Sequence, residues 1–376
     1  MNDTQESDFD FESEFLEYLN KNGKKHYDIF DETQSEYSDF ENELITRISS
    51  LVDILIGKMS AARGISLEIH AFCVKDDFIN AFCFVTNHHY YIGIHSATFV
   101  ELIRKTQILS DYLTVSNRWE DYQNKDVGEI QALLWMDSFK MILSHEYMHI
   151  ILGHCDVICK DSMFLWEVGE CEDLSENFSE KEFQAIEMIA DEFAAKDAAW
   201  QMVSILDDIE KIRYKSLNYY LAILLVFSVF HNYRGEDRRH PSLGIRLHSI
   251  ISVVDDTIIK ELNKTCDRVW TERIETVIDT FMEIVQQFSK LFSYDVVTEL
   301  GVQEFDKDYL ELYNVAADVV KITNSKAVYP IDEFEKIDEN ILELFDTERE
   351  ILAYSAQAGM SYDEACELIK KVKTER

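Results

Sequence analysis

The chain has 376 residues, of which 47% are hydrophobic and 12% aromatic, so it can bury a substantial core. Its 36 basic residues against 72 acidic ones give a net charge of −36, which argues against nucleic acid and anionic membrane surfaces as partners. The seven cysteines are scattered and include no Cys-x-x-Cys pair, which favours reduced thiols over a disulfide framework. We therefore expect a globular cytoplasmic protein.

No targeting or membrane segment is predicted. The first residues are acidic and show no apolar segment behind basic residues, so they do not have the pattern of a signal peptide. The most apolar run, residues 219–230, is too short to span a bilayer and is expected to be a buried helix. Only two prolines and eleven glycines occur in the chain, which favours long helices. We expect no membrane insertion and a predominantly helical α+β fold.

The amino-terminal third begins with an acidic segment. Residues 1–44 are rich in Asp and Glu with interleaved aromatic side chains, a composition typical of a flexible or loosely docked arm. The alternative is an arm that lies over the active site or recruits a partner through its aromatic residues. Apolar residues at helical spacing then predict a helix from Asn42 to about Met59.

A small sheet and a series of helices are predicted to follow. Residues 66–74, 81–86 and 90–94 favour two or three short antiparallel strands, with a turn at Asn87 and His88. A helix restarts at Ala97, and another is expected over residues 128–152, where Gly153 offers a C-cap. Further helices are predicted at 179–206 and 216–231, and amphipathic helices with acidic outer faces after about residue 250.

The helix predicted at 128–152 carries His145-Glu146-x-x-His149. Residues four apart project from one face of a helix, so His145 and His149 can share one metal ion. Glu146 lies roughly 100° around the helix from His145, close enough to accept a proton from a metal-bound water. A zinc site of this type needs a third protein ligand and one open position for water.

A downstream helix offers the third ligand. His154 lies roughly 140° around an ideal helix from His149, so it is rejected as a ligand and expected to cap the helix or support the site. Glu187 and Asp191 share one face of the helix at 179–206, where Glu187 can bind the metal and Asp191 can accept the free N–H of a ligand histidine. The fallback ligands are Glu167, Glu170 and Glu172.

This order of motifs resembles the gluzincin metallopeptidases, and within them the CAAX-prenyl-protease and HtpX-like group, peptidase family M48. The stretch Asn80-Ala81-Phe82 and the segment His240-Pro241-x-x-x-x-Arg246 are similar to further segments of that group. Because this chain has no spanning helix, it is more similar to soluble or phage-exclusion (Lit-like) relatives. ImmA/IrrE-type proteases also resemble the two helical motifs, but they do not explain the His240-Pro241 segment.

The resemblance covers residues 75–250 and implies a zincin-like metallopeptidase core, which we place at 45–250. Composition and helical spacing predict the arm at 1–44 before it and an acidic helical region at 251–376 after it. The resemblance also implies one Zn²⁺ held by His145, His149 and Glu187, with Asp191 accepting the free N–H of a ligand histidine. The expected activity is zinc-dependent endopeptidase action on a cytosolic protein or peptide, with a metal-activated water as the nucleophile.

Roles for the remaining residues follow from the same interpretation. Glu146 is expected to act as the base, and His240 and Arg246 to donate hydrogen bonds to the developing oxyanion. The strand with Phe82 and Phe84 could bind an extended peptide by β-augmentation. The alternatives are an ImmA/IrrE-type regulatory protease and a non-catalytic, zinc-containing helical interaction protein. The sequence does not indicate the oligomeric state.

Overall fold

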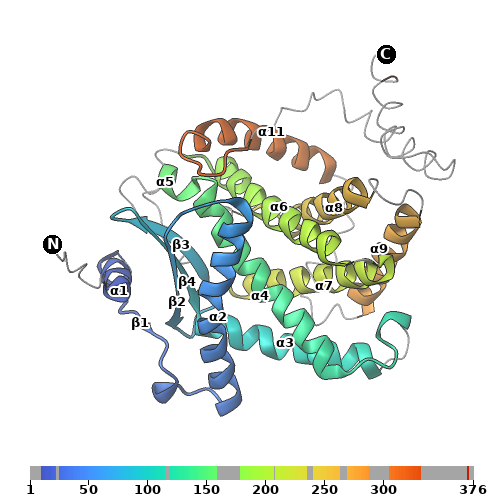
Figure 1. The fold of residues 1–376 in the computed structure, drawn as a ribbon, viewed down its shortest axis with the longest axis horizontal. Coiled ribbons are helices and arrows are strands. Elements are labelled where there is room, and N and C mark those ends of the chain that lie inside the picture. The colour runs from blue at the N-terminus through green and yellow to red at the C-terminus, as the bar shows by residue number, and fades with distance from the viewer. Residues whose placement is uncertain are drawn as a thin grey trace, which may run out of the picture. The chain divides into compact units, whose positions relative to one another are not determined.

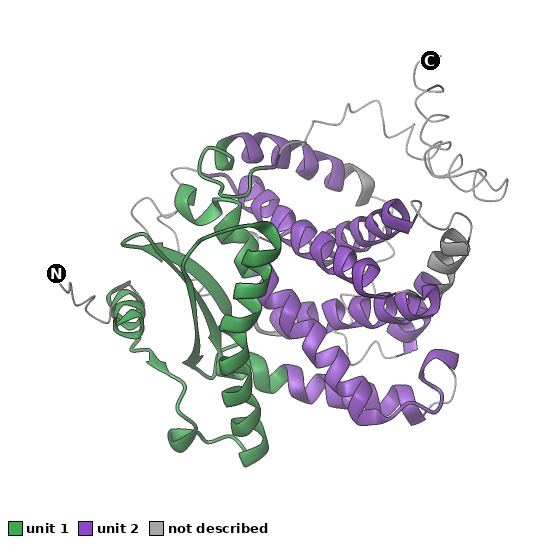
Figure 2. Ribbon diagram, in the orientation of Figure 1, with its two compact units in different colours: residues 1–101, 146–177, 322–330 green, residues 102–145, 178–321, 331–376 purple. Residues whose placement is uncertain are grey.

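The computed structural model describes residues 10–22, 25–115, 119–158, 178–206, 208–234, 240–262, 269–287, 305–331 and 371. They are predominantly helical with one small sheet, as the sequence predicts, and the sheet has four strands instead of two or three (Figure 1). Two compact units are present (Figure 2): unit 1 comprises residues 1–101, 146–177 and 322–330, and unit 2 comprises 102–145, 178–321 and 331–376. The elements in chain order are α1 (Phe11–Asn22), β1 (Asp28–Ile29), η1 (Glu32–Gln34), α2 (Asp39–Arg63), β2 (Ile69–Lys75), β3 (Ala81–Thr86), β4 (His89–His95), α3 (Ser96–Val115), η2 (Glu120–Tyr122), α4 (Val127–Ile151), α5 (His154–Ile158), α6 (Glu180–Ile205), α7 (Ile209–Arg234), α8 (Leu243–Leu262), α9 (Val269–Gln287) and α11 (Phe305–Thr323).

The sheet of unit 1 is mixed, which corrects the expectation of a purely antiparallel one. Its strand order is β1-β2-β4-β3, with β2 and β4 parallel and the other two pairings antiparallel. Strands β3 and β4 form the expected hairpin, because Asn87 and His88 both have positive φ, 45° and 70°, as a two-residue type I′ turn requires. Strand β4 therefore lies between β2 and β3, and β3 is an edge strand among the described residues.

One face of the sheet is aromatic and is covered by α1. Phe15 of α1 is fully buried and packs against Phe72, Phe84 and Tyr91, with ring centroids 4.7, 5.6 and 5.8 Å away. Gly93 leaves room across the ladder for the ring of Phe82, which a Cβ atom would strike. Helix α1 lies within residues 1–44, the segment whose composition favours a flexible arm, and packs on the sheet through these aromatic side chains. The division into domains at 44 and 250 stays a prediction.

The other face of the sheet packs against helices. Tyr90 of β4 donates a hydrogen bond to Asp156 of α5 at 3.0 Å, and the sulfur atoms of Cys83 on β3 and Cys155 on α5 are 3.5 Å apart. The three cysteines among the described residues, Cys73, Cys83 and Cys155, are free and buried, as expected of reduced core thiols. Helix α2 begins at a capping box formed by Ser38 and Glu41 and ends at Gly64, which adopts the left-handed conformation.

Unit 2 is helical, and its apolar helix α7 is buried by the other helices of the unit. Leu217, Tyr220 and Leu225 of this helix are fully buried, and Ser138 of α4 donates a hydrogen bond to the carbonyl of Ala222 at 3.2 Å. The run at 219–230 is therefore a core helix, as predicted. Within the described ranges, no helix has the length and apolar character needed to cross a membrane.

A buried carboxylate joins three helices of unit 2. Glu192 of α6 accepts hydrogen bonds from Ser249 of α8 and, at 3.2 Å, from Tyr309 of α11, both on its Oε1 atom. Burial raises the pKa of Glu192 from 4.5 to about 7, and these two hydrogen bonds only partly oppose that rise. The folded protein therefore holds a proton on Glu192 more tightly than the unfolded chain does.

We expect Glu192→Gln to stabilise the protein above neutral pH. The free energy of unfolding of the wild type should fall as pH rises from 4.5 to about 7, where the folded pKa lies. The full effect of such a shift is about 3 kcal/mol, at about 1.4 kcal/mol per pKa unit. Glutamine keeps the accepting Oε1 without the charge, so urea unfolding at pH 8 should show a gain that shrinks toward pH 5. Exposed Glu180 on the same helix is the control, since Glu180→Gln should change little; equal gains from both variants would contradict the prediction.

Candidate metal centre

The two histidines of the motif lie one turn apart on α4, a continuous helix from Val127 to Ile151. Helix geometry therefore fixes the position of His149 relative to His145. Their helix is anchored by fully or nearly fully buried apolar side chains at Ile142, Tyr147 and Met148. A rigid, buried helix is the support that a metal site needs, because ligands must be held close to one geometry.

Helix α6 carries the two carboxylates of the site, Glu187 and Asp191. It begins at Ser179, whose side chain and that of Glu182 form a capping box. Glu187 and Asp191 follow one turn apart, and each has an exposed fraction of only 1%. Buried carboxylates of this kind require positive charge or hydrogen-bond donors nearby.

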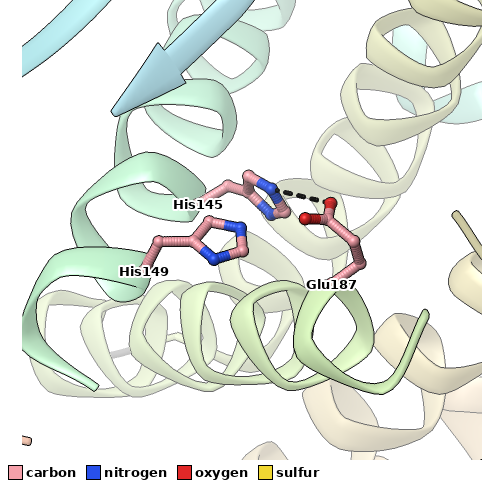
Figure 3. Close-up of side chains that lie close together, drawn as sticks. All are labelled: His145, His149 and Glu187. Atoms are coloured by element: carbon pink, nitrogen blue, oxygen red, sulfur yellow. Dashed lines mark ion pairs between the residues drawn. The ribbon is translucent and has the colours of Figure 1, made fainter. Parts of the chain in front are cut away.

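The structure brings His145, His149 and Glu187 together (Figure 3). Each contributes one ligand atom to a group whose members all lie within 4.8 Å of one another. The Nε2 atom of His145 is 3.3 Å from Oε2 of Glu187. These are the three residues that the sequence predicts as metal ligands, and the described residues contain no other cluster of this kind.

Asp191 contacts the first histidine on the nitrogen that faces away from Glu187, and Arg246 in turn binds Asp191. Oδ1 of Asp191 is 2.8 Å from Nδ1 of His145. Arg246 of α8 donates to both oxygens of Asp191, from Nε at 2.6 Å and from Nη2 at 2.9 Å, and its guanidinium lies over the ring of Phe227. Asp191 thus lies where the sequence predicts it. The role of Arg246 as an oxyanion donor stays a prediction, and two of its N–H groups point to Asp191.

These contacts set the charges at the site. Burial opposes an imidazolium at His145, but the carboxylates of Asp191 and Glu187 outweigh it and raise the pKa of His145 to about 10. Burial likewise opposes the charge on Asp191, yet the Arg246 guanidinium and His145 hold its pKa below the ordinary value. Without a metal ion, the carboxylates of this cluster therefore attract a proton to His145.

His240 approaches the same cluster from the segment before α8. Its Nε2 atom is 3.1 Å from Oε2 of Glu187, the oxygen that also faces His145. The His240-Pro241 segment therefore lies beside the predicted metal ligands, and the role of His240 as a donor to the oxyanion stays a prediction. The fallback ligands Glu167, Glu170 and Glu172 lie outside the described residues.

Glu146, the expected base, is buried with one free oxygen. Its exposed fraction is 6%, and its Oε2 atom has no hydrogen-bond partner among the residues that the structure describes. The thiol of Cys83 on β3 neighbours this carboxylate, and burial together with Cys155 and Glu146 raises the pKa of Cys83. Cys83 is therefore a protonated neighbour of Glu146 that sequence reasoning missed, because no local pattern links β3 to α4.

Phe82 and Phe84 lie on the same edge strand, but their side chains do not reach the surface. Both are fully buried and stack with α1, Phe82 on Phe15 at 6.3 Å and Phe84 on Tyr18 at 4.4 Å. These two side chains are therefore not available to a peptide at the surface, and only Val85 and Thr86 of the strand are partly exposed. The two aromatic side chains belong to the core of unit 1.

The residues present fit a zinc ion. Two imidazoles and one carboxylate, drawn from two helices, form one of the three-ligand sets that catalytic zinc uses. The Nδ1 atom of His145 is engaged by Asp191, which leaves Nε2 for a metal, as is usual for ligand histidines. The unpartnered oxygen of Glu146 can accept a proton from a water molecule.

Comparison with known proteins gives one match. Residues 96–261, a little under half of the chain, are similar to the family model of Peptidase U49, and this range includes every residue of the cluster described above. No curated protein and no solved structure matches the chain. The match supports a protease, while the closer resemblance to the CAAX-prenyl-protease group stays a prediction.

Proposed function

We propose that the chain is a zinc-dependent endopeptidase that hydrolyses peptide bonds of a cytosolic protein substrate. The observation that carries this proposal is the buried cluster of His145, His149 and Glu187, with ligand atoms within 4.8 Å of one another. The similarity to Peptidase U49 supports the reaction class. The cysteines of the described residues, which are free and buried, agree with a reducing compartment.

Each residue of the site has a defined task in this proposal. Zinc bound there would supply a Lewis acid for the scissile carbonyl and lower the pKa of a coordinated water toward about 7. Glu146 takes the proton of the attacking water on its free oxygen and delivers it to the leaving amine. Asp191, held by Arg246, keeps the Nε2 atom of His145 directed at the site. His240 is assigned as the donor to the oxyanion.

The edge strand β3 is proposed to hold the substrate. One of its edges pairs with β4, and the other has no partner strand among the described residues. Cys83 in the middle of β3 neighbours Glu146, so the strand runs past the proposed base. An extended peptide added to this edge would be bound through main-chain hydrogen bonds.

Metal removal tests the proposal directly. The purified chain should contain about one zinc per molecule by elemental analysis and should cleave members of a proteome-derived peptide library. A chelator should abolish cleavage, and added Zn²⁺ should restore it. Cleavage that survives complete loss of metal would contradict the zinc mechanism. Stoichiometric zinc with no cleavage would instead support the non-catalytic interaction protein.

A further inference from the structure

The last carbonyl group of the motif helix α4 accepts hydrogen bonds from a segment far away in the sequence. The last carbonyl groups of a helix have no partner within the helix. In unit 1, the carbonyl of Ile151 accepts hydrogen bonds from the backbone N–H groups of Val328 and Tyr329, at 2.9 and 3.0 Å. The end of α4 is thereby fastened to the loop after α11, which lies beyond the residues that match Peptidase U49.

Gly153 brings this loop close to the turn that follows α4. Its φ of +76° is readily adopted only by glycine, and a Cβ atom here would lie 2.7 Å from the backbone nitrogen of Ala327 and 2.9 Å from the carbonyl oxygen of Thr323. That loop is itself closed by hydrogen bonds from Lys326 and Ala327 to Thr323, at 2.8 and 2.9 Å. Backbone meets backbone at this point, so a side chain at 153 could not be accommodated by a rotamer change.

The turn at Gly153 directs His154 onto the second ligand histidine. His154 is fully buried as the first residue of α5, and its Nδ1 atom is 3.0 Å from Nδ1 of His149. One of these nitrogens must donate and the other accept. Because Nδ1 of His149 is engaged in this way, Nε2 is the atom left for a metal, just as Asp191 leaves Nε2 of His145.

We infer that His154 is a positioning residue for His149, held in place by the Gly153 turn and by the loop at residues 323–329. Ligand histidines usually donate their second N–H to a carboxylate, a carbonyl or water, so an imidazole acceptor is a distinctive arrangement. The inference rests on the proposed function, since it assigns a support to one of the proposed zinc ligands. It also makes the loop after α11 a support of the metal site, acting through the Gly153 turn.

Variants of His154 test the hydrogen bond itself. His154→Ala should weaken zinc binding by about 10- to 100-fold, as the loss of a supporting partner usually does. His154→Asn places an amide oxygen near the position of Nδ1 and should recover most of that affinity. Competition with a chromophoric chelator measures both, and the absorption spectrum of the Co²⁺-substituted protein should change in the alanine variant only. Equal losses in both variants, or none in either, would overturn the assignment.

A pair of glycine variants tests the loop. Gly64 has a φ of +66° and nothing within 4 Å of its Cβ position, so Gly64→Ala carries the same backbone strain without the contact made at Gly153. Gly153→Ala should lower zinc affinity by about tenfold or more, whereas Gly64→Ala should bind zinc like the wild type. Hydrogen exchange of the metal-free protein should show protected Val328 and Tyr329 amides that lose protection only in Gly153→Ala.

The outcomes separate this inference from the proposed function. A wild type that binds no zinc would overturn the proposed function and the positioning role with it. Stoichiometric zinc in the wild type with unchanged affinity in His154→Ala and Gly153→Ala would overturn the inference alone. If Gly153→Ala fails to fold, the comparison of His154→Ala with His154→Asn still decides.

Discussion

Replacing Glu146 by glutamine is expected to lower peptide-bond hydrolysis by at least about 10²-fold while leaving the zinc content unchanged. Glutamine has nearly the shape of glutamate, so the buried position of the side chain should be kept. It cannot accept a proton from water, because its oxygen is a neutral amide carbonyl. The turnover number on a library-derived peptide, measured beside elemental analysis, checks both halves of the result.

The neighbouring residue provides a matched control. Tyr147 is fully buried on the same helix, and its hydroxyl lies 3.1 Å from that of Ser60, away from the proposed chemistry. Tyr147→Phe should therefore keep both zinc and most of the activity. Wild-type turnover in Glu146→Gln would show that another group removes the proton and would leave Glu146 with a structural role only.

Local patterns predicted the elements that carry the site. The spacing of His145 and His149 on an apolar helix predicted α4, and the helical spacing over residues 179–206 predicted α6. Glu187 could be proposed as the third ligand because its helix face is otherwise small or apolar. These features depend on residues within a few turns of one another, so a single sequence reveals them.

Features that depend on distant pairing could not be predicted in the same way. Alternation of side chains predicts strands but not their order, so the parallel pairing of β2 with β4 was not foreseen. Arg246 and Asp191 lie on different helices, and no spacing rule shows that they form an ion pair. Ideal helix geometry would turn the side chain of His154 away from that of His149. Helix α4 instead ends at Ile151, and the turn at Gly153 brings the ring of His154 to the ring of His149.

The amino-terminal segment shows how composition can hide periodicity. Its acidic residues favour a flexible arm, but Phe11, Phe15 and Tyr18 recur at helical spacing. In the structure this stripe faces the aromatic side of the sheet, where Phe15 is fully buried and Phe11 stacks on His70. The acidic residues of α1 are not all solvated either, because Glu14 accepts a hydrogen bond from Tyr91. Periodicity was the more informative signal here.

Glu187→Gln is expected to weaken zinc binding by more than about 10²-fold, so that the purified variant no longer carries stoichiometric metal. Loss of a direct ligand should exceed the 10- to 100-fold cost that is usual for a supporting residue. Glutamine keeps the volume of the buried side chain but removes the negative charge that faces Nε2 of His145 and of His240. Competition titration with a chelator of known affinity measures the change.

Glu192→Gln is the matched control for this prediction. Glu192 lies on the same helix and is also buried, but its partners are Ser249 and Tyr309 rather than histidines. The control should therefore bind zinc like the wild type, so that a loss confined to Glu187→Gln identifies a ligand and not a general disturbance of α6. Full zinc affinity in Glu187→Gln would remove Glu187 from the ligand set. The third ligand would then have to be sought among Glu167, Glu170 and Glu172.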